Sequence, residues 1–137
     1  MNARPKVIFA AERTIPDVTP GGITFSKLNT NLGNGMDKNS GIFTTPVGGV
    51  YLFHFSALAK NKSKMIHIKV NKNGVLQFYI HYNLANNSAA NNIVSYSWSM
   101  VLSKDDTMNL HLNDNGLYAS KNNLHVFLTG QLLKATE

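Results

Sequence analysis

The sequence contains no cysteine, which excludes a disulfide framework, a catalytic thiol and a thiolate metal site. It also has no apolar run of 18 or more residues, so the sequence predicts no helical membrane span and no membrane insertion. The first six residues lack the apolar core of a signal peptide. Either the protein is not exported or this is the mature part of a longer chain.

Charge is also scarce, because only 15% of the 137 residues are charged and only 7 are acidic, whereas 43% are hydrophobic. This composition is typical of a globular chain, and the length suits one domain spanning residues 1–137. The net charge of +6 makes an anionic partner plausible. The basic residues are scattered singly with no stripe or stacking platform, so nucleic acid is not a favoured partner.

Helical periodicity is absent as well, and period-2 alternation takes its place. Asparagine occurs at 18 positions, many of them clustered, and asparagine favours turns over helices. The alternating segments are separated by such breaks about every ten residues, which predicts an all-β sandwich or jelly roll. The expected strands are Lys6 to Ala11, Ile23 to Leu28, Gly49 to Ala59, Met65 to Val70, Val75 to Tyr82, Ile93 to Leu102, Met108 to Leu112 and Leu124 to Leu133.

Several of these strands are apolar on both faces. Val50, Leu52 and Leu58 lie opposite an aromatic row, and Phe127 and Leu133 lie opposite the core side of the last strand. In a monomeric sandwich the outer face is expected to be polar. We therefore expect self-association to cover these faces, although isolated apolar residues on a surface are also ordinary.

A longer pattern runs from Phe25 through Asn31, Met36 and Phe43 to the segment Gly49-x-Tyr51-x-Phe53-x-Phe55. These intervals resemble the signature of the globular C1q domain family, with Met36 standing where the family has an aromatic residue or Leu. The closing segment Leu128 to Leu133 is similar to the family's Phe-x-Gly-x-Leu-Leu, with Leu128 in place of the aromatic residue. Lys104-Asp105-Asp106 departs from the family's usual Gly-Asp.

The resemblance implies a ten-stranded antiparallel jelly roll, C1q/TNF-like and trimeric, in a secreted, extracellular protein. It further implies recognition rather than catalysis. No Gly-X-Y collagen repeat is present, so the chain corresponds to a head domain alone. The lack of cysteine and the Asn-rich loops look most similar to C1q-domain proteins of invertebrates.

Nothing in the sequence favours an enzyme. The five histidines stand in no catalytic or metal-binding motif, and each falls in an expected strand. The adjacent carboxylates of Asp105 and Asp106 point apart in a strand or turn and make a poor acid–base pair. Because some members of the similar family bind Ca²⁺ with loop carboxylates, Asp105, Asp106 and Asp17 are candidate ligands. Two solvated aspartates in a turn are the alternative, so the expected cofactor is none or Ca²⁺.

A ligand site is predicted in three polar loops. Counting antiparallel strands back from the last one places residues 71–74, 103–106 and 120–123 at one end, opposite the C-terminus. Their amide and ammonium groups suit glycan hydroxyls, acetamido groups and carboxylates. Asn61 and Asn86 begin N-glycosylation triplets in loops expected at the other end. The candidate ligand-binding residues are Lys72, Asn73, Lys104, Asp105, Asp106, Lys121, Asn122 and Asn123.

Three functions follow as hypotheses. The first is a C1q-like pattern-recognition protein of innate immunity that binds glycans, lipopolysaccharide or another anionic microbial surface ligand as a homotrimer. Lys104→Ala or Lys121→Ala would weaken that binding. The second is a secreted signalling ligand, adipokine- or cerebellin-like, that binds a protein receptor. The third is a structural head that trimerises a larger chain.

Overall fold

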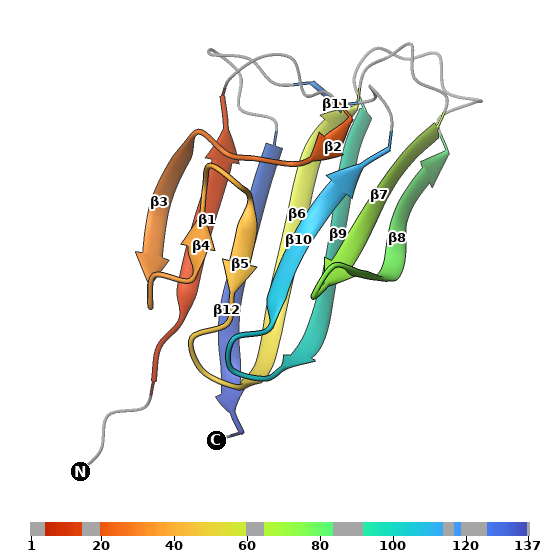
Figure 1. The fold of residues 1–137 in the computed structure, drawn as a ribbon. Coiled ribbons are helices and arrows are strands. Elements are labelled where there is room, and N and C mark those ends of the chain that lie inside the picture. Colours follow the sequence, from red (N-terminus) through yellow and green to blue (C-terminus); the bar gives the residue numbers. More distant parts are fainter. Residues whose placement is uncertain are drawn as a thin grey trace.

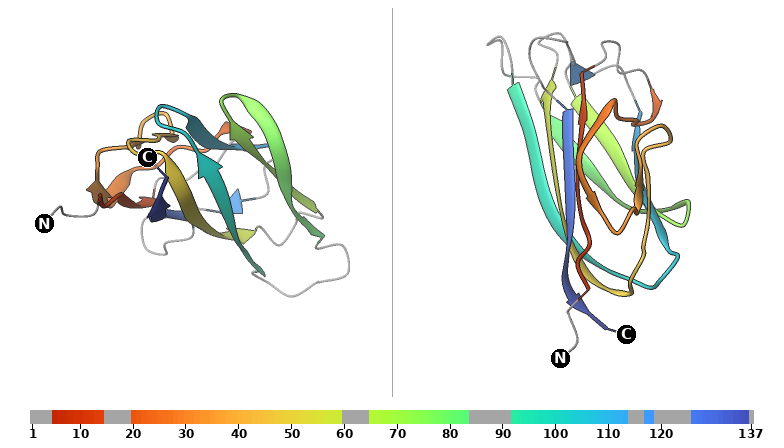
Figure 2. Two further views of the ribbon diagram at one scale, coloured as in Figure 1. Left: turned by 90° about the horizontal axis from the view of Figure 1, so that it is seen from below. Right: turned by 90° about the vertical axis from the view of Figure 1, so that its left-hand side faces the viewer.

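The computed structural model describes residues 5–14, 20–59, 65–83, 92–113, 117–118 and 126–136. These residues form strands and no helix, so the described part of the chain contains no helix that could cross a membrane. The strands lie in two sheets stacked face to face (Figures 1 and 2). The strands are β1 (Ile8–Arg13), β2 (Gly21–Gly22), β3 (Lys27–Leu32), β4 (Met36–Asp37), β5 (Ile42–Thr44), β6 (Gly49–Ala59), β7 (Met65–Lys72), β8 (Val75–Asn83), β9 (Asn92–Leu102), β10 (Thr107–Leu112), β11 (Leu117–Tyr118) and β12 (Val126–Ala135).

The two sheets have five strand positions each. The first sheet runs β9-β6-β12-β1-β3, and the two-residue β11 pairs with β6 beyond the end of β12. The second sheet runs β4-β5-β10-β7-β8, and β2 pairs with β10 beyond the end of β5. All pairs are antiparallel, and the chain passes repeatedly between the two sheets, for example after β6, β8 and β9. The expected ten-stranded antiparallel jelly roll is confirmed.

The core lies between the sheets and follows the predicted alternation. On the first sheet, the side chains of Tyr51, Phe53 and Phe55 are 0% exposed. On the second sheet, the apolar sides of β7 and β10 are equally buried. The ring of Phe53 stacks on Trp98 at 5.5 Å and meets the edge of Phe43 at 5.9 Å. Aromatic contacts thus join the two layers, because Phe43 belongs to β5 of the second sheet.

Gly130 on β12 makes this aromatic packing possible. A Cβ atom there would lie 2.3 Å from Cε2 of Phe9 and 2.8 Å from Cε1 of Phe53. Such distances are far below van der Waals contact, so a larger residue would push both rings out of place. The glycine in the family-like closing segment is therefore required by core packing.

The β7–β8 hairpin contains a bulge between Val70 and Asn71. The Asn73-Gly74 turn, in which both residues have positive φ, pairs Lys72 with Val75. Continuing that register would place the apolar side of β7 opposite the polar side of β8. The bulge shifts the pairing by one residue, so that Ile68 pairs with Ile80 and the apolar sides coincide.

Several details differ from the sequence-based expectations. The strand expected over Lys6 to Ala11 runs from Ile8 to Arg13. The strand expected over Ile23 to Leu28 begins only at Lys27, although Ile23 and Phe25 are buried in the core. Tyr96, expected to point inward with Trp98, remains 44% exposed. It lies on β9, the terminal strand of its sheet, where the sandwich is open toward β8. Packing against a facing sheet is incomplete at such an edge.

The outer face of the first sheet carries the apolar residues that the sequence analysis singled out. One row of paired residues crosses all five strands as Ser99, Leu52, Gln131, Ile8 and Leu32. Within it, Ile8 is 38% and Leu32 is 50% exposed in the single chain. We call this face the outer apolar surface; it comprises Ile8, Leu32, Val50, Leu52, Leu58, Ile93, Val101, Phe127 and Leu133.

The open edge between β8 and β9 forms a second apolar region. Phe78 on β8 contacts Tyr96 and Trp98 on β9, with ring centroids 5.8 and 5.6 Å apart. Met100 lies farther along β9 and is partly buried against the core. We call Phe78, Tyr96 and Met100 the edge cluster.

Candidate ligand-binding site

Two of the three predicted loops come together at one end of the sandwich. The Asn73-Gly74 turn of the second sheet lies beside residues 103–106, which connect β9 to β10. Asp105 takes a left-handed backbone conformation with φ 72°, which asparagine and aspartate tolerate best among non-glycine residues. We call Asn73-Gly74 and residues 103–106 the turn pair.

Side-chain hydrogen bonds hold the turn pair together. The Asn73 amide donates from Nδ2 to Oδ1 of Asp106 (3.0 Å) and accepts at Oδ1 from the backbone N–H of Thr107 (2.8 Å). The other oxygen of Asp106 accepts from the backbone N–H of Ser103 (2.8 Å). Lys72 Nζ lies 3.7 Å from the same oxygen. Both ends of the Asn73 amide and both oxygens of Asp106 are thus engaged inside the protein.

The hydrogen bonds around Asp106 lower the pKa of its carboxyl group. The largest cause is the Asn73 side chain, followed by the backbone N–H of Ser103, while partial burial acts in the opposite direction. The positive charge of Lys72 contributes less. Donors that favour the charged form make Asp106 a fixed carboxylate near neutral pH. Its role in this geometry is to lock the turn.

The backbone of residues 105 and 106 is anchored to Thr45, which is fully buried. The N–H of Asp105 donates to the Thr45 carbonyl, and the Asp106 carbonyl accepts from both the N–H and the hydroxyl of Thr45, all at 2.8 Å. The turn between β9 and β10 is therefore tied to the segment that follows β5. This part of the site is rigid before any ligand arrives.

The calcium site expected at Asp105 and Asp106 stays a prediction, and the turn itself engages one of its two carboxylates. Ca²⁺ takes six to eight oxygen ligands, whereas each Asp106 oxygen already accepts a hydrogen bond within the turn. Across the described ranges, no group of three or more His, Cys, Asp or Glu side chains is placed to hold a metal ion. Asp17 lies outside the described residues.

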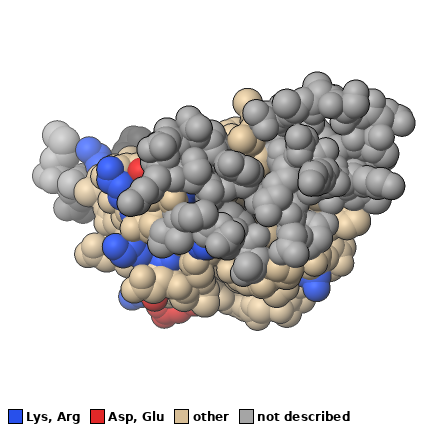
Figure 3. Space-filling view, turned by 90° about the horizontal axis from the view of Figure 1, so that it is seen from above, with Lys and Arg blue, Asp and Glu red and all other residues tan. Residues whose placement is uncertain are grey.

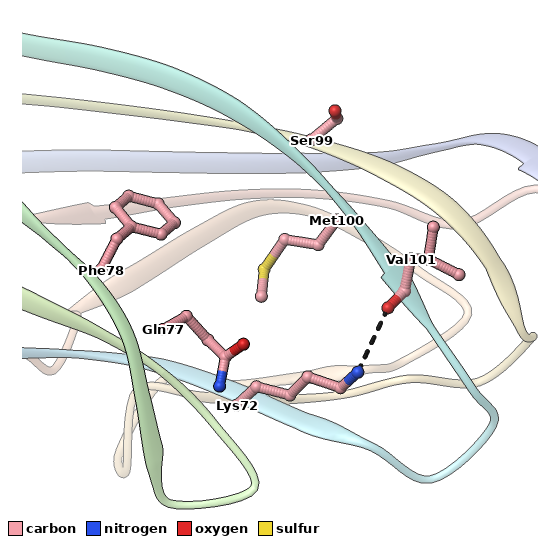
Figure 4. A pocket seen from close by; sticks show the side chains of 6 residues that line it. All are labelled: Lys72, Gln77, Phe78, Ser99, Met100 and Val101. Atoms are coloured by element: carbon pink, nitrogen blue, oxygen red, sulfur yellow. Dashed lines mark hydrogen bonds between the residues drawn. The ribbon is translucent and has the colours of Figure 1, made fainter.

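A cleft of about 300 Å³ adjoins the turn pair at the open edge between β8 and β9. In Figure 4, Phe78 and Met100 project into this space from opposite sheets, and Lys72 reaches across to β9. The Nζ atom of Lys72 donates a hydrogen bond to the carbonyl of Val101 (3.4 Å). The cleft thus offers an apolar wall beside an ammonium group and the amide of Gln77.

The predicted residues divide into three groups. Lys72, Asn73 and Asp106 contact one another, and their polar groups serve the turn itself. Lys104 and Asp105 stand on the exposed part of the same turn, and neither side chain has a hydrogen-bond or ion-pair partner within the described residues. Lys121, Asn122 and Asn123 lie outside the described residues, as do the glycosylation triplets at Asn61 and Asn86.

The predicted position of the site was wrong. The turn pair lies at the end where β12 finishes, because Leu102 and Ala135 both pair with Gly49 (Figure 1). The strand count required a full-length strand between β10 and β12, whereas β11 has two residues and does not cross the sandwich. Residues 120–123 lie outside the described residues, and β12 starts at Val126, at the end opposite the turn pair.

Cleft residues such as Gln77, Val101 and Ser99 were missed by sequence reasoning. They belong to the terminal strands of two different sheets, and no sequence interval links them. The apolar alternation of β8 and β9 was the available signal, because it placed Phe78 and Met100 on inward faces. Figure 3 looks onto the end opposite the turn pair; the described Lys and Arg side chains visible there are scattered, without a continuous basic stripe.

Comparison with known proteins identifies relatives over most of the chain. A family model described as "C1q domain" matches residues 8–133. Human complement C1q tumor necrosis factor-related protein 3 is 30% identical over 119 residues, which cover 85% of this chain and 46% of the relative. Zebrafish Caprin-2 is 38% identical over 71 residues, covering 50% of this chain and 8% of that protein. The chain therefore spans less than half the length of these relatives.

Solved structures agree on the fold. The globular domain of zebrafish complement 1qA superposes with a TM-score of 0.74 at 18% identity, covering 96% of this chain and 99% of that one. Murine APRIL superposes with a TM-score of 0.72 at 15% identity, covering 93% of this chain and 99% of the APRIL chain. These likenesses show a jelly roll shared with tumour necrosis factor ligands. The family matched is one of ligand-binding domains and not of enzymes. The chain belongs to the C1q domain family.

Proposed function

We propose that this domain acts outside the cell as a homotrimer that binds its ligand without catalysing a reaction. Membership of the C1q domain family supports ligand binding. The sequence contains no cysteine and therefore no thiol nucleophile, which agrees with binding without catalysis. Assembly and ligand are argued separately, since different parts of the molecule support them.

The trimer is supported by two different apolar regions on one chain. The outer apolar surface covers the face of the first sheet, and the edge cluster lies at the open side between β8 and β9. Unlike regions that pack against each other form a heterologous contact, which closes into a ring when the rotation allows. A ring of three copies would cover both regions in every copy.

Ile8 and Ile42 allow a matched test of this assembly. Ile8 lies on the outer apolar surface and is 38% exposed, and Ile42 lies on the second sheet and is 36% exposed. We expect Ile8→Glu to convert the trimer to monomer in sedimentation equilibrium and Ile42→Glu to leave it intact. A wild-type protein that sediments as a monomer at micromolar concentration would rule out the trimer.

For the ligand, we propose a glycan or another anionic component of a microbial surface, bound at the exposed part of the turn pair, which lies outside both apolar regions. The observation that carries this is the pair Lys104 and Asp105, which stand on a rigid turn without a partner among the described residues. An ammonium and a carboxylate group suit a sugar's hydroxyl and acidic groups. Three copies in a trimer would add avidity to a weak single site.

A glycan and lipopolysaccharide array on the purified protein tests this proposal. We expect selective binding that Lys104→Ala weakens and that Lys38→Ala, a change of an exposed lysine away from the turn pair, leaves unchanged. The array is run with and without Ca²⁺, and a loss of binding on chelation would point to Asp105 and Asp106 as calcium ligands. An array without signal from a folded trimer would contradict the glycan proposal.

A protein receptor is the second candidate, and the similarity to C1q tumor necrosis factor-related protein 3 favours it. On this hypothesis the chain is a secreted signalling ligand, and the exposed residues Lys104 and Asp105 of the turn pair would contribute to the receptor contact. Binding to cells that survives enzymatic removal of their glycans, together with a blank glycan array, would support the receptor over the glycan.

A further inference from the structure

The bulged hairpin places two histidines side by side on the outer face of the second sheet. His67 on β7 pairs directly with His81 on β8. Their rings lie with centroids 4.5 Å apart and planes inclined by 29°. If the register of the Asn73-Gly74 turn continued without the bulge, His67 would pair with Ile80, and His81 would lie on the opposite face of the sheet. The bulge that aligns the core therefore also creates this pair.

The surroundings of the two rings form a small hollow. Tyr79 meets the His67 ring edge-on at 6.0 Å. Asn113, at the end of β10, donates its backbone N–H to the carbonyl of His67 (3.1 Å). Together with the two histidines, these residues line a hollow of about 250 Å³ that opens outward from the sheet.

The ring nitrogens of this pair are not engaged by the described part of the protein. No hydrogen bond or ion pair involves either imidazole among the described residues. His54 on the first sheet differs, because its Nδ1 lies 2.6 Å from the hydroxyl of Ser97. His111 on β10 is not part of the pair, because the residue that it pairs with on β7 is Lys69. Two adjacent imidazoles with free nitrogens are a donor set for a metal ion.

We propose that His67 and His81 bind a divalent transition metal ion such as Zn²⁺ or Ni²⁺. Neutral imidazole is the commonest metal ligand in proteins and suits Zn²⁺, Cu²⁺ and Ni²⁺ better than Ca²⁺ or Mg²⁺. Zn–N bonds of about 2.0–2.1 Å at tetrahedral angles need nitrogens about 3.3 Å apart. Rings at 4.5 Å reach that spacing by turning about the broad χ2 torsion of histidine.

Asn113 lines the same hollow as the two histidines. Its side-chain oxygen or water would complete the coordination of the ion. Because the pair lies on the second sheet, away from the outer apolar surface and the turn pair, the site is independent of the proposed assembly and ligand. A positive or negative result for metal binding therefore decides nothing about the trimer or the glycan ligand.

Titration calorimetry with Zn²⁺ alone, on the chain without a histidine tag, tests the site. We expect one equivalent to bind, and His67→Ala or His81→Ala to weaken it about tenfold or more. His111→Ala, on the same face outside the pair, should leave the affinity unchanged. Equal affinity in the wild type and both pair variants, or an equal loss in His111→Ala, would overturn the assignment.

Thermal unfolding gives a second readout that does not rely on His67→Ala folding. A ligand that binds only the folded state raises the unfolding midpoint. Zn²⁺ should raise the midpoint of the wild type, EDTA should reverse the rise, and His81→Ala, a change of an exposed side chain, should show a smaller rise at the same Zn²⁺ concentration. A rise in His81→Ala as large as in the wild type would place the metal elsewhere and refute the proposal.

Discussion

The outer faces of the two sheets differ although their inner faces are alike. Both inner faces are apolar and buried, as the sides of β6 and β7 that meet in the core show. On the outer face of the first sheet, Ile8, Leu32 and Leu52 share one row. On the outer face of the second sheet, the corresponding positions hold His67, Lys69 and His111.

This difference separates folding from association. A sandwich needs one apolar face per sheet, and a second apolar face adds nothing to the fold of a single chain. The apolar outer face of the first sheet is therefore best explained by contact with another copy. The polar outer face of the second sheet remains available to solvent and small ligands. Four predictions test this division.

The largest expected effect concerns the shared inner faces. Phe53→Ala should lower the free energy of unfolding by about 3–5 kcal/mol, because it removes a fully buried ring and leaves a cavity. Phe127→Ala, the same change on the partly exposed side of β12, should cost less than half as much in the monomer. Urea unfolding in a monomeric Ile8→Glu background measures both, and equal losses would contradict the assignment of faces.

The second-largest effect is expected when an apolar and a charged residue are exchanged on the two outer faces. Leu52→Lys is expected to raise the dissociation constant of the trimer at least about 100-fold, roughly 2.7 kcal/mol, because a charge would enter an apolar contact. Lys69→Leu on the second sheet should leave it unchanged. Analytical ultracentrifugation distinguishes the two, and an equal response would mean that the faces do not differ in role.

A smaller effect is expected where the sheets are joined at the turn pair. Asn73→Gly removes the side-chain bonds to Asp106 and Thr107 while tolerating the φ of 53°. The loss should be about 1–2 kcal/mol of unfolding free energy. Asn34→Gly is the matched control, since Asn34 has φ 56° and an exposed side chain. If both variants lose the same stability, the side-chain lock contributes nothing.

The smallest expected effect depends on pH. The pKa of Asp106 is lowered in the folded state, first by the Asn73 amide and then by the Ser103 N–H. Its contribution to stability is therefore complete above the unfolded value of about 3.9 and is lost as pH falls through the folded pKa. Asp106→Asn should reduce the loss of stability between pH 5 and pH 3 in urea unfolding. An unchanged pH dependence would show that the carboxylate does not stabilise the turn.

Strand positions were largely predictable because alternation is a local property. Gly49 to Ala59 was predicted with the observed bounds, and the inward aromatic row of that strand was correct. The end of the sandwich that carries the turn pair was not predictable. The predicted end depended on a full-length strand between β10 and β12 that crosses the sandwich. The strand found there, β11, has two residues and does not cross it.

The candidate site was predicted in part. Turn chemistry identified Asn73 and Asp106 as residues of polar loops, but the sequence cannot show that their side chains bond to each other across 33 positions. That contact makes them part of a lock and leaves Lys104 and Asp105 as the exposed polar groups of the turn. The cleft was missed because its walls come from two sheets.

The sequence by itself determined the all-β class, the faces of most strands and the family, since all three follow from intervals between residues along the chain. Only the tertiary structure decided the register of the β7–β8 hairpin, because its turn and its apolar pattern require pairings that differ by one residue. The bulge satisfies both, and it alone brings His67 and His81 together. Packing between distant segments also decided which polar side chains are engaged within the protein and which face the solvent.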